Sequence, residues 1–345
     1  MKLFKSQSIL ASIILASLVT FSCSDDDDDN NSAGATSATI IYTSNNSDGN
    51  ITSYDVSDLT NITSKTLLTA STMADGIYYD SSSDAAIQAS RSGLNLEGFT
   101  SISNSMTNTS VTIDISGSSD MSSPRELAVN GNTYVVADNA DVDGNNETPD
   151  GKLFIYTKSG NSFTLRNTIT TDFKLWGITF DGDDLYAVVD ATNELAVYTD
   201  FLSNTGDATV SASKRIAIEG IVRTHGLTYD AAADVMVLTD IADATNTQDD
   251  GGFHIIEGFT SKFNNVENGA TLALAQQIRV AGSATLLGNP VDVAYDAATQ
   301  TVYIAEAGNG GGRILAFNNI GSGGNITPDI NNSLAAASSV YLSKK

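Results

Sequence analysis

The sequence has little of what small secreted proteins and nucleic-acid-binding proteins rely on. Its 345 residues include one cysteine, so no disulfide can form within the chain. Lysine and arginine number 17 against 41 aspartate and glutamate residues, and the net charge is −24. Such a chain is poorly suited to neutralise phosphate groups, which argues against nucleic acid as a partner. Because no disulfide can form, the stability of the fold must come from an apolar core or from bound metal.

Long apolar runs are also scarce. Residues 9–21 are uncharged and mostly apolar, but crossing a bilayer as a helix takes roughly 20 residues. Lys2 and Lys5 precede this run, an order of charge and apolar residues typical of a secretory signal peptide. Ser22 and Cys23 follow, and this ending resembles the lipobox of bacterial lipoproteins. The resemblance implies cleavage before Cys23 and lipid, including acyl chains such as palmitate, on that residue. The alternative is an ordinary secretory signal with a chance cysteine.

A block of five aspartates follows the cysteine, at residues 25–29. Adjacent carboxylates repel one another and lose hydration on burial, so this block stays in water. Its start resembles the export tag that carries lipoproteins of Bacteroidetes to the cell surface, on the residues Ser24, Asp25, Asp26 and Asp27. The resemblance implies a lipid anchor in the outer membrane and a protein that faces the cell exterior. A solvated linker without a sorting role is the alternative. We expect a signal peptide at residues 1–22, a lipidated acidic tether at residues 23–37 and a folded domain at residues 38–345.

One short pattern recurs through the folded domain. A small or acidic residue, an aliphatic residue, any residue, an aromatic or aliphatic residue and usually aspartate follow one another in GIYYD, ELAVN, GITFD, GLTYD, DVAYD and, more weakly, SVYLS. Successive copies start 50, 51, 49, 66 and 47 residues apart, and such periods indicate propeller blades or solenoids. Further alternating segments rich in β-branched and aromatic residues follow each full copy, which is typical of strands. About four strands in each repeat favour a β-propeller blade.

The two ends of the domain each hold part of a repeat. Residues 39–44 match a second strand without a first, and residues 336–343 match a first strand without the rest of its blade. We therefore predict that the N- and C-terminal strands complete one blade of an all-β, six-bladed propeller, which protects both strand edges. An extra hairpin within residues 262–288 would make seven blades. The stretch at residues 289–317 resembles NHL-repeat and gluconolactonase-like six-bladed propellers.

The repeat also predicts where a ligand could bind. In a propeller the first strand of each blade lines the central channel, and the residue before the repeated pattern lies at a channel mouth. That position holds Asp75, Arg125, Trp176 and His225 in four successive copies. A carboxylate, a guanidinium, an indole and an imidazole form the mixed apolar and polar set that small-ligand pockets use. We predict a ligand-binding site there; the alternative is that these side chains satisfy one another or loop backbones.

An acidic loop at residues 138–151 holds a second candidate site. Oxygen-bearing side chains alternate around Gly144, and this spacing resembles an EF-hand-type calcium loop. The resemblance implies bound Ca²⁺ with the ligands Asn139, Asp141, Asp143, Asn145 and Asp150. Asn139 replaces the usual first aspartate, and Asp150 replaces the closing glutamate. The alternative is a solvated acidic turn between two strands.

The sequence gives weak grounds for catalysis. Gluconolactonase-like propellers hold a divalent metal in the channel with a glutamate, an asparagine and an aspartate. Here Asp75, Glu126 and Asp292 are available near the channel, but no asparagine follows that pattern. No nucleophile-elbow motif or phosphate-binding lysine loop is present either. We therefore expect a surface binding or scaffold module, not an enzyme, with a glycan, a peptide or an outer-membrane protein as partner. A metal-dependent hydrolase of the lactonase type is the alternative.

Overall fold

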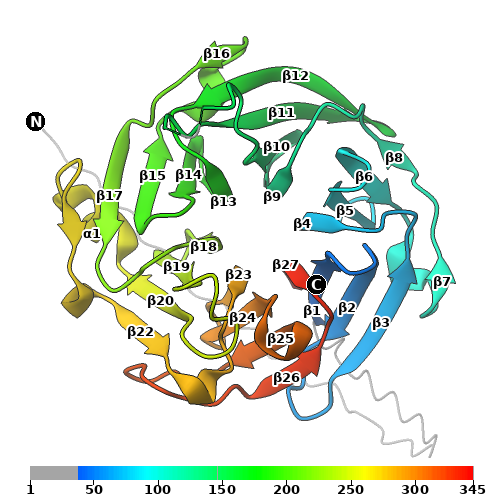
Figure 1. The fold of residues 1–345 in the computed structure, drawn as a ribbon. Coiled ribbons are helices and arrows are strands. Elements are labelled where there is room, and N and C mark those ends of the chain that lie inside the picture. Colours follow the sequence, from blue (N-terminus) through cyan, green and yellow to red (C-terminus); the bar gives the residue numbers. More distant parts are fainter. Residues whose placement is uncertain (1–37, 146, 345) are drawn as a thin grey trace, which may run out of the picture. The chain divides into compact units, whose positions relative to one another are not determined.

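The computed structural model describes residues 38–145 and 147–344. These residues form six four-stranded antiparallel blades arranged radially around a central axis (Figure 1). The predicted six-bladed all-β propeller is therefore confirmed. None of the helices in this part of the chain is long and apolar enough to cross a membrane. The predicted signal peptide and tether lie outside the described residues, and with them Cys23, Ser24, Asp25, Asp26 and Asp27.

Each blade runs from an inner strand beside the axis to an outer strand. The inner strands are β27 (Ala337–Lys344), β4 (Ala74–Asp80), β9 (Pro124–Asn130), β13 (Leu175–Asp181), β18 (Leu227–Asp230) and β23 (Pro290–Asp296), in blades 1 to 6. In the same order the second strands are β1 (Thr39–Asn45), β5 (Ala85–Ser90), β10 (Thr133–Asp138), β14 (Asp184–Val189), β19 (Val235–Asp240) and β24 (Thr301–Glu306). The third strands are β2 (Ile51–Asp55), β6 (Asn95–Phe99), β11 (Gly151–Ser159), β15 (Glu194–Tyr198), β20 (Gly252–Glu257) and β25 (Arg313–Phe317). The outer strands are β3 (Thr63–Leu68), β8 (Ile115–Ser116), β12 (Ser162–Thr171), β17 (Lys214–Ile218), β22 (Ile278–Ala281) and β26 (Ile330–Ser333).

Short elements decorate the outer edge and the loops. Three two-residue strands pair in parallel with outer strands: β7 (Thr109–Ser110), β16 (Ala208–Thr209) and β21 (Thr271–Leu272). The helical segments are α1 (Phe259–Asn265), η1 (Ile102–Asn104), η2 (Phe201–Ser203), η3 (Leu274–Gln276), η4 (Ser283–Thr285) and η5 (Asn309–Gly311).

Blade 1 is completed by both ends of the described chain. The C-terminal strand β27 pairs antiparallel with the N-terminal strand β1, with Tyr42 opposite Tyr341 and Thr43 opposite Val340. The prediction that the terminal strands share one blade is therefore confirmed. This pairing covers the inner edge of β1, which would otherwise be exposed as a template for aggregation.

The core consists of six apolar clusters, one between each pair of adjacent blades. Successive side chains of a strand point to opposite faces, so each blade contributes to two clusters. In β1, for example, Ile41 packs toward blade 6 and Tyr42 toward blade 2. The second strands β5, β19 and β24 are buried at every residue because neighbours cover both of their faces. Six interfaces among six blades mean that the ring is closed.

The alternative of seven blades is wrong. Residues 262–288 contain the end of α1, the short strand β21 and the outer strand β22 of blade 5, and no extra hairpin. The apolar side chains Phe263 and Leu272 of this stretch pack into the cluster between blades 4 and 5. The stretch therefore completes an existing interface, which explains the longer spacing between two of the repeats.

Candidate ligand-binding site at the channel

The four predicted site residues form one continuous stack across blades 2 to 5. Nη1 of Arg125 donates to the carboxylate of Asp75 at 3.2 Å. The guanidinium carbon of Arg125 lies 4.3 Å from the centre of the Trp176 ring, and the ring of His225 lies 3.7 Å from that of Trp176, with planes 4° apart. Because both neighbours lie so close to the indole, they must cover its opposite faces. The structure thus brings the predicted residues together, and they also satisfy one another.

Three charged residues that the sequence analysis did not select extend this stack. Nε of Arg91 lies 3.6 Å from the carboxylate of Asp75. At the other end, Oδ1 of Asp190 contacts Nε2 of His225 at 3.2 Å and accepts a hydrogen bond from Nη2 of Arg223 at 2.7 Å. We call the whole set the arginine mouth: Asp75, Arg91, Arg125, Trp176, Asp190, Arg223 and His225.

A β-bulge recurs where the inner strands begin. The pairing of the inner strand with the second strand shifts register between Asp75 and Ile77 in β4 and between Pro290 and Asp292 in β23. Strands β9 and β13 show the same shift at the equivalent level. A bulge places two residues opposite one and re-aims their side chains. This geometry explains how both the mouth residue and its successor contribute to the channel.

Asp190 differs from the equivalent residue of other blades. Asp138, Asp240 and Glu306 each end a second strand and accept backbone N–H groups from the loop before the inner strand of their own blade. Asp190 follows the second strand of blade 4, but its Oδ1 accepts hydrogen bonds from side chains of blade 5. The recurrence of this acidic position is the signal by which sequence reasoning could have found Asp190.

The contacts fix the protonation of the stack. Burial alone would raise the pKa of Asp190, but hydrogen bonds from His225 and Arg223 lower it to about 2. Burial lowers the pKa of His225, against the opposing influence of Asp190, so the imidazole is neutral at pH 7. Its single N–H then lies on Nε2 and donates to Asp190, because a carboxylate can only accept. Nδ1 is left as an unprotonated acceptor.

Three buried nitrogen atoms of the arginine mouth have no hydrogen-bond partner among the described residues. They are Nδ1 of His225, Nε of Arg125 and Nε of Arg91, the last of which lies at ion-pair distance from Asp75. The His225 side chain is only 4% exposed. A buried polar atom without a partner costs about 1–3 kcal/mol. The mouth therefore offers two unused N–H donors and one unused acceptor to a ligand or a water molecule.

A pair of buried carboxyl groups lies one residue further along the inner strands. Glu126 of β9 and Asp292 of β23 face each other across the channel and interact directly. Oδ2 of Asp292 also accepts hydrogen bonds from Oγ of Ser339 at 2.7 Å and from the N–H of Val340 at 2.8 Å. Burial raises the pKa of Glu126 well above its usual range and that of Asp292 to about 7. Two touching carboxyl groups out of water cannot both ionise, so the pair shares one proton.

Glycines narrow the channel at the level of this pair. A Cβ on Gly177 would lie 2.5 Å from the carbonyl oxygen of His225, and one on Gly226 would lie 2.5 Å from Cα of Asp292. The N–H of Gly177 donates to that same carbonyl oxygen at 2.8 Å. The absence of side chains at these two positions lets adjacent inner strands approach closely, which encloses the carboxyl pair.

The channel does not fit the metal centre that the family resemblance implied. The expected set was a glutamate, an asparagine and an aspartate, but the positions equivalent to Glu126 and Asp292 are occupied by Gly76, Gly177, Gly226 and Ser339. Two carboxyl groups that share a proton carry one negative charge, and Asp75 is already bound by two arginines. This donor set is too small for a hard divalent cation, which takes six or more oxygen ligands as Ca²⁺.

The predicted calcium-binding residues divide into two groups. Carboxylate oxygens of Asp141, Asp143 and Asp150 lie within 4.8 Å of one another, and these are the acidic residues of the described chain that could jointly hold a metal. Asp141 also lies 3.5 Å from Nζ of Lys174, an ion pair that a cation would have to displace.

The two asparagines of the loop bind within the protein. Oδ1 of Asn139 accepts a hydrogen bond from Oγ of Ser123 at 2.9 Å. Oδ1 of Asn145 accepts one from the N–H of Glu147 at 3.2 Å. The three predicted carboxylate ligands lie together, whereas the two predicted amide ligands accept hydrogen bonds from the protein. Calcium binding at this loop stays a prediction.

Comparison with known proteins shows the fold and no family. No protein-family model matches the chain, and no curated protein matches its sequence. A solved chain of a nidogen/laminin complex matches with a TM-score of 0.56 and 12% identity, over 88% of this chain and 98% of that one. Two Bacteroides propellers also match, both provisionally named 6-phosphogluconolactonases. The one from Bacteroides uniformis has a TM-score of 0.57 and 8% identity, over 89% of this chain and 100% of that one. The one from Bacteroides fragilis has a TM-score of 0.55 and 9% identity, over 90% of this chain and 99% of that one. At these identities the likeness concerns the propeller fold alone.

Proposed function

We propose that this protein is a ligand-binding propeller whose arginine mouth captures an anionic group. The observation that carries the proposal is the pairing at Asp75. Two guanidinium groups, those of Arg91 and Arg125, share this one carboxylate, so positive charge exceeds negative charge there. Nε of Arg125 has no partner among the described residues. Arginine N–H groups are well suited to bind carboxylate and phosphate.

The rest of the chain makes this charge distribution informative. The net charge of −24 repels anions from most of the surface, yet three of the few arginines gather around one mouth. With a neutral His225, three guanidinium groups face two carboxylates, those of Asp75 and Asp190. A local positive site in an acidic protein steers small anions to one place. Acidic glycans and acidic peptides share the required chemistry.

Calorimetric titration tests this proposal. The probes are an oligogalacturonate, its neutral methyl ester and an acidic peptide of equal charge. We expect the charged glycan or the peptide to bind and the neutral ester to bind at least tenfold more weakly. Whichever anion binds identifies the source of the charge. Equal binding of the ester and the free acid would refute an anion site.

A matched pair of variants locates the binding. Arg125→Gln removes the guanidinium at the mouth, and Arg166→Gln removes one on the outer strand β12 of the same blade. We expect R125Q to weaken anion binding at least tenfold and R166Q to leave it unchanged. The same loss in both variants would point to a general effect of charge.

The location of the protein is part of the proposal. We propose that lipid on Cys23 anchors it in the outer membrane and that the tag at Ser24, Asp25, Asp26 and Asp27 directs it to the cell surface. Cys23→Ala should move the protein from the membrane fraction to the soluble fraction. Protease treatment of intact cells should degrade the wild-type chain; complete protection would contradict surface display.

A lactone hydrolase is the second candidate. The names of the two Bacteroides propellers favour it, and the donor set of this channel does not. An assay for hydrolysis of 6-phosphogluconolactone distinguishes the two candidates. Acid release is recorded with a pH-stat, with and without added divalent metal. Turnover that is lost in Glu126→Gln would favour the hydrolase, whereas anion binding without turnover favours the binding module.

A further inference from the structure

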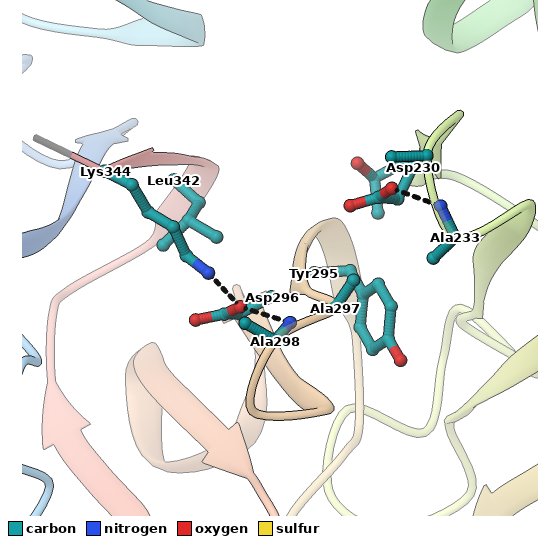
Figure 2. A pocket seen from close by; sticks show the side chains of 10 residues that line it. Asp230, Ala233, Tyr295, Asp296, Ala297, Ala298, Leu342 and Lys344 are labelled. Atoms are coloured by element: carbon teal, nitrogen blue, oxygen red, sulfur yellow. Dashed lines mark hydrogen bonds and ion pairs between the residues drawn. The ribbon is translucent and has the colours of Figure 1, made fainter. Parts of the chain in front are cut away.

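The channel has a second opening at the opposite ends of the inner strands. Its cavity of about 620 Å³ is lined by residues that include Asp230, Tyr295, Asp296, Leu342 and Lys344. Figure 2 shows the carboxylate of Asp230 across the cavity from Lys344, whose ammonium group binds Asp296. We call this opening the aspartate mouth, defined by Asp230, Tyr295, Asp296 and Lys344.

A narrower cavity of about 330 Å³ lies inside the channel. Each blade contributes one aliphatic side chain to its wall: Ile77, Leu127, Ile178, Leu227, Val293 and Val340. Glu126 and Asp292 also line it and form its polar end. Thr228 lines both this cavity and the aspartate mouth, so the two are neighbours along the channel. A cavity of about 150 Å³ can hold a benzene molecule, so by volume alone this space suffices for an aliphatic chain.

The charges along this half of the channel favour cations. Four of the six inner strands end in aspartate at this side: Asp80, Asp181, Asp230 and Asp296. Lys158 and Lys344 pair with two of them, whereas no lysine or arginine of the described chain forms an ion pair with Asp230. Burial and the nearby carboxylates of Asp184 and Asp234 raise the pKa of Asp181. The aspartate mouth therefore attracts positive charge.

The inner end of the cavity matches a single positive charge. Asp292 accepts hydrogen bonds from Ser339, Val340 and the N–H of Val293, so it holds the negative charge of the pair while Glu126 holds the proton. A lone charge buried away from water is costly unless an opposite charge meets it. One ammonium group supplies this match, whereas a divalent metal needs more oxygen ligands than this level provides.

We propose that this half of the channel binds a linear aliphatic diammonium ion, the chemical class of the polyamines. One ammonium group contacts the Glu126–Asp292 pair, the methylene chain lies among the six aliphatic side chains, and the second ammonium group reaches Asp230. Asp292 and Asp296 are four residues apart on β23, about 13 Å along the strand, which bounds the length of the ligand. This site lies apart from the arginine mouth and does not depend on the function proposed there.

Calorimetric titration of the purified full-length chain tests the two-ended geometry. The probes are diamines from 1,4-diaminobutane to 1,10-diaminodecane, with 1-aminooctane and 1,8-octanediol as matched controls. We expect 1,8-diaminooctane to bind at least tenfold more tightly than 1-aminooctane, and the diol not to bind. Asp230→Asn should lower the affinity for the diamine to that for the monoamine. The affinity for the monoamine should stay unchanged. Asp183 is an exposed aspartate outside the cavity on the same side of the propeller. Asp183→Asn should change neither the affinity for the diamine nor that for the monoamine.

A second pair of variants tests the inner end. Asp292→Asn removes the negative charge of the pair and should weaken the binding of both amines at least tenfold. Glu126→Gln keeps that charge and should change the affinity for either amine less than threefold. If D292N fails to fold, the D230N comparison decides alone. Equal affinity of diamine and monoamine, or no effect of D230N, overturns the proposal. Binding of calcium or zinc that is lost in E126Q would assign the pair to a metal and also overturn it. R125Q should leave diamine binding unchanged, which separates this result from the test of the arginine mouth.

Discussion

The imidazole of His225 stacks on the indole of Trp176, with ring centres 3.7 Å apart and planes 4° apart. Trp176 is the only tryptophan of the chain, so its fluorescence reports on the arginine mouth alone. Asp190 holds the far edge of the imidazole at 3.2 Å. The protonation of His225 and the occupancy of the mouth can therefore both be followed through one signal.

The fluorescence of Trp176 should fall when His225 becomes protonated, because a stacked imidazolium quenches indole emission. Burial lowers the pKa of His225 from 6.5, so we expect the quenching step below pH 6.5. In Asp190→Asn the step should move to still lower pH, since the carboxylate that favours the imidazolium is gone. Asp183→Asn, on the opposite side of the propeller, is the control. A step at the same pH in D190N and wild type would contradict the pairing.

The Glu126–Asp292 pair should make stability fall as pH rises. In the folded state the pair first ionises at about pH 7, on Asp292 while Glu126 keeps its proton, whereas Asp292 of the unfolded chain ionises near pH 3.8, so the folded state binds more protons between these values. The free energy of unfolding therefore decreases across this window. Glu126→Gln removes the shared proton, and we expect its loss of stability across the same window, from pH 3.8 to about 7, to be smaller by about 2 kcal/mol. Urea unfolding at several pH values measures the difference; parallel curves for the two proteins would refute a shared proton.

Calcium should raise the melting temperature if the acidic loop binds it. Three carboxylates converge there, and Ca²⁺ prefers oxygen ligands of this kind. We expect a chelator to abolish the rise and Asp143→Asn to weaken it. Asp249→Asn, in the other acidic insertion, is the matched control. Absence of binding heat and of a melting shift in wild type would remove calcium from the account.

Removal of β27 should abolish folding of the propeller. This strand pairs with β1 and contributes Val340 and Ala337 to the cluster between blades 6 and 1. A chain that ends at Ala336 exposes the edge of β1, and we expect it to aggregate. A synthetic peptide of residues 337–345 should restore solubility by strand addition, and a scrambled peptide should not. A stable monomer without the strand would contradict the closed ring.

Much of the fold follows from local pattern. The repeat spacing gives six blades, and the unmatched strands at residues 39–44 and 336–343 give the closure. The convergence of Asp75 with Arg125, and of Trp176 with His225, follows because equivalent repeat positions meet around one axis. The extra segment at residues 262–288 was open to a wrong interpretation, because periodicity does not separate α1 and β21 from a hairpin.

The remaining site residues depend on contacts between blades. Arg91 and Arg223 lie in loops, and the repeat does not say which neighbouring carboxylate they reach. The position of Asp190 is visible in the repeat, yet its role differs from that of Asp138. The carboxylate of Asp138 accepts hydrogen bonds from the loop backbone of its own blade, whereas that of Asp190 contacts side chains of blade 5. The proton shared by Glu126 and Asp292 likewise requires the closed ring, which places strands from blades 3 and 6 across the channel.

The most direct test of the account is a titration of Trp176 fluorescence with the anion that binds in calorimetry, performed on wild type, R125Q and R166Q. An anion at the arginine mouth contacts groups that stack on this indole, so its emission should change with saturation. We expect the change in wild type and R166Q, with at least tenfold weaker binding in R125Q. An anion that binds all three proteins equally, or without any change in emission, would contradict the assignment of the arginine mouth as the ligand site.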